Sequence, residues 1–161
     1  MKTRLILIAF VFCASNALSQ PFVFQTNFGT PGNDYGFSFI PVSDGGLVMA
    51  GHSNYFGPGD LDVVLLKLDS SYNLQWFKRY GGTGNEQAIK VINCSDGGFA
   101  ISGMTQSFGA GGYDAMIIKT DSTGNVDFMK TFGGLTDDRF LNVRQTIDSG
   151  YILAGSTTSF G

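Results

Sequence analysis

The chain has 161 residues, which is enough for one domain of ordinary size. Its 23 glycines and 15 phenylalanines favour short β-strands joined by tight turns, because glycine adopts positive φ and aromatic side chains suit pleated sheets. Thirteen acidic residues outnumber ten basic ones, so we expect no nucleic-acid partner, since phosphate backbones attract basic proteins.

Residues 1–19 have the organisation of a secretory signal peptide. Lys2 and Arg4 form a basic start, residues 5–14 form an apolar run of ten, and small residues precede a cleavage point before Gln20. The run is shorter than the roughly 20 apolar residues that a membrane span needs, so we expect no span. A buried N-terminal helix is the alternative. The sequence predicts a secreted, extracellular or cell-surface protein.

Removal of this segment changes the cysteine and charge content. It takes away Cys13 and two basic residues, so eight basic residues would face 13 acidic ones, a formal charge of −5. Cys94 would remain alone, and no intrachain disulfide could form. A small secreted domain without a disulfide must depend on its apolar core or on the stacking of repeats.

The strongest signal in the chain is an internal repeat of 52 residues. After a lead-in at 20–27, residues 28–79 and 80–131 are identical at 18 of 52 positions without a gap, and residues 132–161 begin a third, partial copy. The matching positions include Asp44, Asp96 and Asp148; Gly51, Gly103 and Gly155; Phe56, Phe108 and Phe160; Asp62 and Asp114; and Lys67 and Lys119.

Each unit is predicted to contain four strands. The turn after the first strand, Asp44-Gly45-Gly46, predicts a primed hairpin turn, because Asp and Gly tolerate positive φ. The third strand is apolar on both faces, which predicts burial on both sides. The fourth alternates apolar and polar residues, which predicts an outer edge. In the first unit the four strands cover about residues 36–42, 47–51, 62–68 and 74–78.

Three further features refine this pattern. Residues 121–125 predict a type I turn with Gly124 in the left-handed region, and Tyr72 at the same phase of the first unit predicts a strained turn. Small residues in the second strand, at the phase of Ala50, predict close packing by a neighbour. A helical interpretation of residues 86–92 or 138–146 is the alternative to the first strands of the later units.

Residues at fixed phases give the unit a recognisable pattern. They are Asp44-Gly45-Gly46, Gly51, Phe56-Gly57, Asp62, Lys67-Leu68-Asp69, Asn73, Trp76 and Tyr80-Gly81-Gly82. With four short strands per unit and a period near 50, this pattern resembles the seven-bladed β-propeller repeat family of secreted bacterial and archaeal proteins. The resemblance covers residues 28–161 and implies an all-β fold of four-stranded propeller blades without catalytic residues.

A closed propeller needs at least four blades, whereas the third copy here reaches Gly161 after two strands. We therefore interpret the chain as an incomplete propeller, the N-terminal fragment of a longer protein. The alternative is a natural short protein that pairs its exposed edge with another copy of itself.

Most residues that could carry chemistry recur at one phase, so we expect them to serve the unit. The Asp44 series should form turns, and Asp34, Glu86 and Asp138 should cap the crossovers between units by accepting backbone N–H bonds. Lys67 and Lys119 should extend to the surface or pair with an aspartate of the unit.

The unique residues do not assemble into a known catalytic pattern. His52 is the only histidine, and Met104 and Ser156 stand at its phase, so neither a zinc site nor a catalytic triad is expected. Calcium binding by Asp60 and Asp62 is an open alternative, although their spacing matches no calcium-binding loop. The glycine-rich residues 82–85 do not form a phosphate cradle. We expect no catalytic, cofactor-binding or metal-binding residues, and no enzyme.

The sequence therefore predicts a non-enzymatic structural or interaction module that binds an unknown protein or glycan and that can self-associate through an exposed edge. Tyr55, Phe56 and Tyr113 fall on predicted loops. Phe56 recurs and should wedge between blades, whereas Tyr55 does not recur and is the better contact candidate. The alternatives are a carbohydrate-binding module and the accessory propeller of a larger secreted hydrolase.

Overall fold

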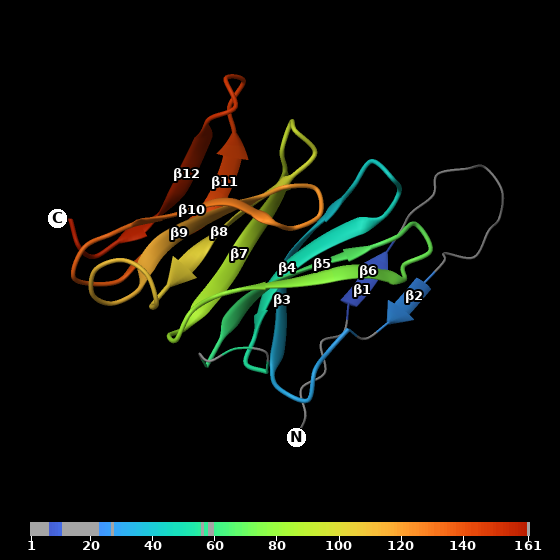
Figure 1. Ribbon diagram of the computed structural model, residues 1–161, viewed down its shortest axis with the longest axis horizontal. Coiled ribbons are helices and arrows are strands. Elements are labelled where there is room, and N and C mark those ends of the chain that lie inside the picture. Colours follow the sequence, from blue (N-terminus) through green and yellow to red (C-terminus); the bar gives the residue numbers. More distant parts are fainter. Residues whose placement is uncertain (1–6, 11–22, 27, 56, 58–59, 161) are drawn as a thin grey trace.

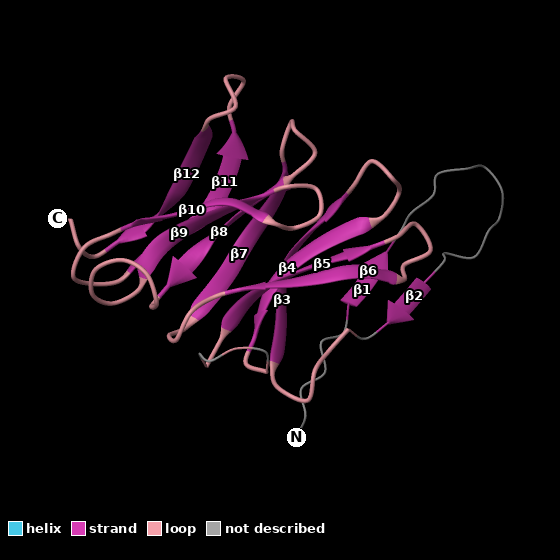
Figure 2. Cartoon of the chain, in the orientation of Figure 1, coloured by secondary structure: helices cyan, strands magenta, loops and turns pink. Residues whose placement is uncertain are grey.

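The computed structural model describes residues 7–10, 23–26, 28–55, 57 and 60–160. All the regular elements in these ranges are strands (Figure 2), so the predicted all-β class is confirmed. None of the described segments forms a helix that could cross a bilayer. The predicted signal peptide and its alternative, an N-terminal helix, fall mostly outside the described residues.

The strands form two four-stranded and two two-stranded antiparallel sheets, and each large sheet follows chain order (Figure 1). The first sheet contains β3 (Asp34–Pro41), β4 (Leu47–Ser53), β5 (Asp62–Leu68) and β6 (Leu74–Tyr80), and the second contains β7 (Glu86–Asn93), β8 (Phe99–Thr105), β9 (Asp114–Thr120) and β10 (Val126–Phe132). The pairs are β1 (Leu7–Phe10) with β2 (Val23–Thr26), and β11 (Asp138–Gln145) with β12 (Tyr151–Thr157).

Equivalent strands begin 52 residues apart, so the four-strand prediction holds for both complete units. The first strands begin two residues earlier than predicted, at Asp34 and its equivalents, and β6 continues to Tyr80. The helical interpretation of residues 86–92 and 138–146 was wrong, because these residues form β7 and β11. The reason is that each is tied to the next strand as an antiparallel hairpin.

The first two sheets pack face to face around a shared apolar core. From the first sheet, Val48, Ala50 and Leu65 enter this core, and the second sheet contributes Ile101 and Met116, all without exposed surface. Burial of a side chain of this size stabilises a fold by about 1.5–3 kcal/mol. The small residues predicted at one phase of the second strand are indeed tightly packed in the first two units, as Ala50 and Ser102.

The same faces meet again between the second and third units. Ala100 and Ile117 are the equivalents of Val48 and Leu65, and they pack against Val143 of β11 with Tyr151 and Leu153 of β12. An aromatic pair also recurs across both boundaries, with ring centroids 6.1 Å apart in each case. These pairs are Trp76 with Phe99, and Phe128 with Tyr151.

The predicted environments of the third and fourth strands are confirmed. Every residue of β9 is buried, and so is nearly every residue of β5. In contrast, β6 and β10 lie at sheet edges and expose much of their polar side. The alternation of apolar and polar residues in the sequence therefore correctly predicts which strand lies at the edge of the sheet.

The hairpin turns between first and second strands differ from the primed turns predicted. In the first unit the Gly45 N–H donates to the Val42 carbonyl at 3.0 Å, and only Gly45 has positive φ, at 83°. A primed type I turn would need positive φ at both central residues. The turn is therefore a type I turn followed by one left-handed residue, which is Gly97 in the second unit and Ser149 in the third.

The turns between third and fourth strands agree with their prediction. Gly124 has φ of 79° and donates its N–H to the Asp121 carbonyl. Tyr72 adopts φ of 63° in the equivalent turn, a conformation that costs a non-glycine residue on the order of 1 kcal/mol.

A glycine in each second strand is required by a bulge in the strand beside it. Gly103 pairs with Ala88 just before the irregularity between Ala88 and Lys90. A Cβ on Gly103 would lie 1.9 Å from the Gln87 carbonyl oxygen, which is far inside van der Waals contact. Equivalent clashes occur at Gly51 and Gly155.

We predict that Gly103→Ala lowers the free energy of unfolding by about 3 kcal/mol, because the two strands must separate to admit a methyl group. Urea unfolding followed by circular dichroism measures this. Gly97→Asn is the matched control: no atom lies within 4 Å of its Cβ position, and asparagine tolerates positive φ. An equal loss for both variants would contradict the clash.

Candidate functional site

Each junction between units begins with an acidic residue that opens the first strand. Asp34, Glu86 and Asp138 accept the backbone N–H of the residue four positions earlier, at 2.7, 2.8 and 2.9 Å respectively. These bonds fold the glycine-rich crossover back onto the strand. The capping role predicted from their common phase is confirmed.

The third strand of the preceding unit meets the same crossover. The Glu86 N–H donates to the Leu61 carbonyl at 2.7 Å, and the Asp138 N–H donates to the equivalent Tyr113 carbonyl at 2.6 Å. These bonds bring the first residue of β5 next to the start of β7, and the first residue of β9 next to the start of β11.

As a result, two carboxylates from consecutive units meet over a glycine. A Cβ on Gly81 would lie 1.8 Å from Asp62 Oδ1 and 2.6 Å from Glu86 Oε2. At the second junction, Gly133 occupies the same position between Asp114 and Asp138. The pairing was not predicted from the sequence, although the recurrence of both acids and the glycine at a constant spacing was visible.

The partners of the two acidic pairs differ. Arg79 Nη1 donates to Asp62 Oδ2 at 3.2 Å, whereas Thr131 stands at the arginine phase in the second unit. Burial raises the pKa of Asp62, against the opposing effect of Arg79. At the second junction the Ser159 hydroxyl, with other donors, lowers the pKa of Asp138 to about 2.

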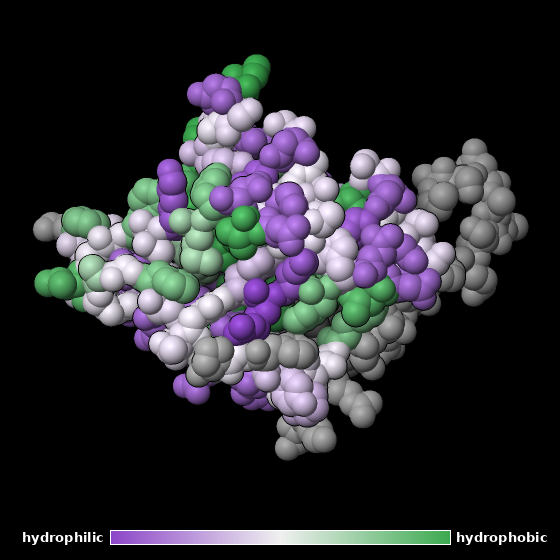
Figure 3. All heavy atoms as spheres, in the orientation of Figure 1, coloured by the Kyte–Doolittle hydropathy of each residue, from purple (hydrophilic) through white to green (hydrophobic). Residues whose placement is uncertain are grey.

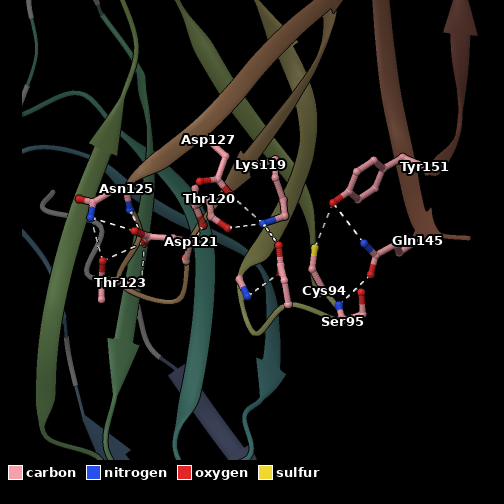
Figure 4. Close-up of polar contacts among 12 residues, drawn as sticks. Cys94, Ser95, Lys119, Thr120, Asp121, Thr123, Asn125, Asp127, Gln145 and Tyr151 are labelled. Carbon is pink, nitrogen blue, oxygen red and sulfur yellow. Dashed lines mark hydrogen bonds and ion pairs between the residues drawn. The ribbon is translucent and has the colours of Figure 1, made fainter. Parts of the chain in front are cut away.

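A buried lysine of the third strand pairs with a turn aspartate within each complete unit, and Figure 4 shows the lysine of the second unit. Lys119 Nζ lies 2.8 Å from Asp96 Oδ2 and 2.9 Å from Asp127 Oδ2, and it donates to the Thr120 carbonyl. Burial lowers the pKa of Lys119, but the bonds to Asp96 and Asp127 raise it more, so the ammonium stays charged. Lys67 contacts Asp44 in the same way, as the sequence predicted.

The recurring aspartates of the turns form local hydrogen bonds. Asp44, Asp96 and Asp148 each accept the N–H of the residue two positions later, which is the predicted turn role. Asp121 accepts the N–H groups of Asn125 and Thr123, and these bonds lower its pKa to about 2 (Figure 4).

His52 is buried in an apolar setting. Its ring lies 5.0 Å from that of Tyr35 and 4.9 Å from that of Phe37, and its Nδ1 has no hydrogen-bond partner among the described residues. Burial lowers the pKa of His52 to about 4. The imidazole is therefore neutral near pH 7 and is not oriented by a carboxylate as a general base would be.

Cys94 is also buried, with its sulfur 3.5 Å from the Tyr151 hydroxyl (Figure 4). Burial raises the pKa of the thiol, which disfavours the reactive thiolate.

The remaining candidates lie apart from one another. Asp60 is exposed on its loop, whereas Asp62 is buried at the junction. Within the ranges that the structure describes, no three acidic, histidine or cysteine side chains converge as a metal site. In the glycine-rich segment 82–85, the Gly84 N–H donates to the Ser107 hydroxyl and not into an open cradle.

The aromatic loop residues differ in how far they are exposed. Tyr55 is 53% exposed, and Tyr113 is half-buried, with its hydroxyl accepting from Gln87 at 3.4 Å. Phe56 lies outside the described residues. Its equivalent Phe108 lies over Gly82 in the crossover and is 41% exposed, so the wedge between blades stays a prediction.

No family model matches the chain. No curated protein matches it either.

We predict that Asp96→Ala lowers the free energy of unfolding by about 1 kcal/mol, through loss of the bond from the Gly98 N–H and of one partner of Lys119. Thermal unfolding measures the loss. Asp148→Ala is the control, since it removes the same turn bond, together with the bond from the Thr146 hydroxyl, at an aspartate that no described lysine contacts, and it should cost less. A binding defect in Asp96→Ala with an unchanged melting curve would contradict the structural role.

Proposed function

We propose that the protein is a secreted or cell-surface repeat module of the β-propeller type that acts by binding and not by catalysis. The observation that carries the proposal is the unit-to-unit interface that occurs twice, at equivalent positions 52 residues apart. Four-stranded sheets that stack on one another through repeated faces are the building principle of propellers.

Both faces of a sheet are used in this stacking. In the second sheet, Ile101 and Met116 face the first unit, and Ala100 and Ile117 face the third. A sheet of four strands cannot bury two apolar faces by itself, so each unit depends on a neighbour on either side.

The third unit has apolar surface that this pattern would cover. Leu141, Ile152 and Phe160 are exposed, with Ile152 at 65%. Hydrophobic side chains also protrude at the tip of the β11–β12 hairpin and on the C-terminal side of the molecule (Figure 3). This supports an incomplete propeller, in which a further unit packs on β11 and β12.

Binding is favoured over catalysis because the polar residues of the junctions are engaged in structure. Glu86 and Asp138 accept backbone N–H bonds, Asp62 accepts from Arg79, and the buried lysines pair with turn aspartates. Tyr55 is exposed in the loop before β5 and does not recur, so it is the proposed contact residue for a protein or glycan partner.

A carbohydrate-binding module is the second candidate. It is favoured by the exposed Tyr55 beside the polar Asn54, whose amide oxygen accepts the Asn33 N–H at 2.7 Å. An exposed aromatic ring next to an ordered amide suits the face and hydroxyls of a sugar.

Sedimentation at micromolar concentration tests the proposal. The chain beginning at Gln20 should self-associate, because the face and edge of its third unit are uncovered. Addition of a third and fourth strand copied from residues 113–132 should reduce association and raise the melting temperature. A compact, cooperative monomer from the unextended chain would contradict the incomplete propeller and favour a self-contained β fold.

A further inference from the structure

The first junction contains a buried carboxylate oxygen without a hydrogen-bond donor. The Asp62 side chain is 1% exposed, and its Oδ2 accepts from Arg79 at 3.2 Å. Asp62 Oδ1 has no hydrogen-bond partner among the described residues. Burial of a charged oxygen without a hydrogen bond destabilises the folded state, so we expect a donor beside Asp62 Oδ1.

The group facing this oxygen is another acid. Asp62 Oδ1 and Glu86 Oε2 both lie over Gly81, where even a Cβ would collide with them. Two carboxylates this close in a buried site do not both ionise readily, whereas one proton between them turns repulsion into a hydrogen bond.

The hydrogen bonds indicate which acid carries the proton. Glu86 Oε2 accepts the Gly82 N–H at 2.8 Å, and Glu86 Oε1 accepts the Thr105 hydroxyl at 2.7 Å and the Ser107 N–H at 3.1 Å. Glu86 therefore has three donors, whereas Asp62 Oδ1 has none among the described residues. Arg79, the cation that contacts Asp62 among the described residues, has a side chain that is 34% exposed, so solvent screens its attraction for the Asp62 carboxylate.

We propose that Asp62 and Glu86 share one proton in the folded protein, held on Asp62 Oδ1 and donated to Glu86 Oε2. The junction of the first two units is then a pH-sensitive contact that tightens as the pH falls. The inference does not depend on what the protein binds.

Electrostatics agree with this geometry. Burial is the main cause that raises the pKa of Asp62, Glu86 from β7 raises it further, and Arg79 from β6 opposes both. A carboxyl with a raised folded-state pKa stabilises the fold fully below its ordinary value of 3.8, and this stabilisation is lost as pH rises through the raised value.

The second junction provides a control acid, Asp138, which stands at the phase of Glu86. Asp138 Oδ1, like Asp62 Oδ1, has no hydrogen-bond partner among the described residues, but Asp138 Oδ2 accepts the Gly134 N–H at 2.9 Å and the Ser159 hydroxyl at 2.6 Å, and the pKa of Asp138 is lowered to about 2. Asp138 is therefore ionised at every pH above its ordinary range. Its contribution to stability is lost only in strong acid, as pH falls through the lowered value.

The experiment is urea unfolding of the protein from about pH 4.5 to about pH 8, compared with Asp62→Asn and Asp138→Asn. The contribution of His52 to the pH dependence must be separated from that of Asp62. The lowered pKa of His52 makes stability rise with pH between about 4 and about 6.5. The difference between parent and variant at each pH removes this contribution.

The stability of the parent relative to Asp62→Asn should fall as pH rises, because an amide is neutral at every pH and can still donate to Glu86. The stability of the parent relative to Asp138→Asn should not change over the same pH range. A parent and an Asp62→Asn variant with the same pH dependence would overturn the proposal.

Two further measurements keep the test decisive if Asp62→Asn fails to fold. Carbon-13 NMR titration of the parent should show the Asp62 carboxyl titrating above 3.8, and titration at or below this value would overturn the shared proton. Unfolding should also be the same in calcium chloride and in a chelator. Stabilisation by calcium would overturn it in favour of a cation held between the two acids.

Discussion

The structure depends on the burial of apolar sheet faces between consecutive units. Each four-stranded sheet is apolar on both sides, and stacking on the neighbouring unit buries a face that its own strands leave uncovered. The first boundary buries Leu65 and Ile101 completely, and the second uses Ile117 at the same phase as Leu65. At about 1.5–3 kcal/mol for each buried side chain of this size, a few such residues exceed any polar contribution at the boundary.

The polar groups of the junction are consequences of this packing. When two sheets stack, the start of one unit's third strand is carried to the start of the next unit's first strand, and acids at both positions are taken out of water. Backbone N–H groups, Arg79 and the Ser159 hydroxyl offset that cost. Gly81 and Gly133 are needed because any side chain there would occupy the space of the carboxylates.

Much of this fold could be predicted from the sequence because the repeat shows each pattern more than once. The apolar runs of β5 and β9, the edge position of β6, the left-handed Tyr72 and the capping acids all follow from local residue types. The turn at Asp44-Gly45-Gly46 was assigned the wrong type, because the residues tolerate positive φ at several positions and only the strand register selects one.

Features that depend on contacts between units could not be predicted in the same way. The approach of Asp62 to Glu86 arises from the stacking of two sheets, and nothing in the local sequence fixes that geometry. The exposure of Phe108 has a similar origin, since a recurring aromatic residue can pack between units or over a crossover. Tyr55 is proposed as the contact residue because it breaks the repeat.

The central claim is that side chains of consecutive sheets stabilise each other across the boundary. A double-mutant cycle on Trp76 and Phe99 tests this coupling most directly. Their rings lie 6.1 Å apart across the first boundary. We expect the two alanine substitutions to show a coupling of about 0.5–1.5 kcal/mol, while Trp76 with Tyr151, which lie on the first and third units, should be additive. Additive losses for Trp76 and Phe99 would contradict the account.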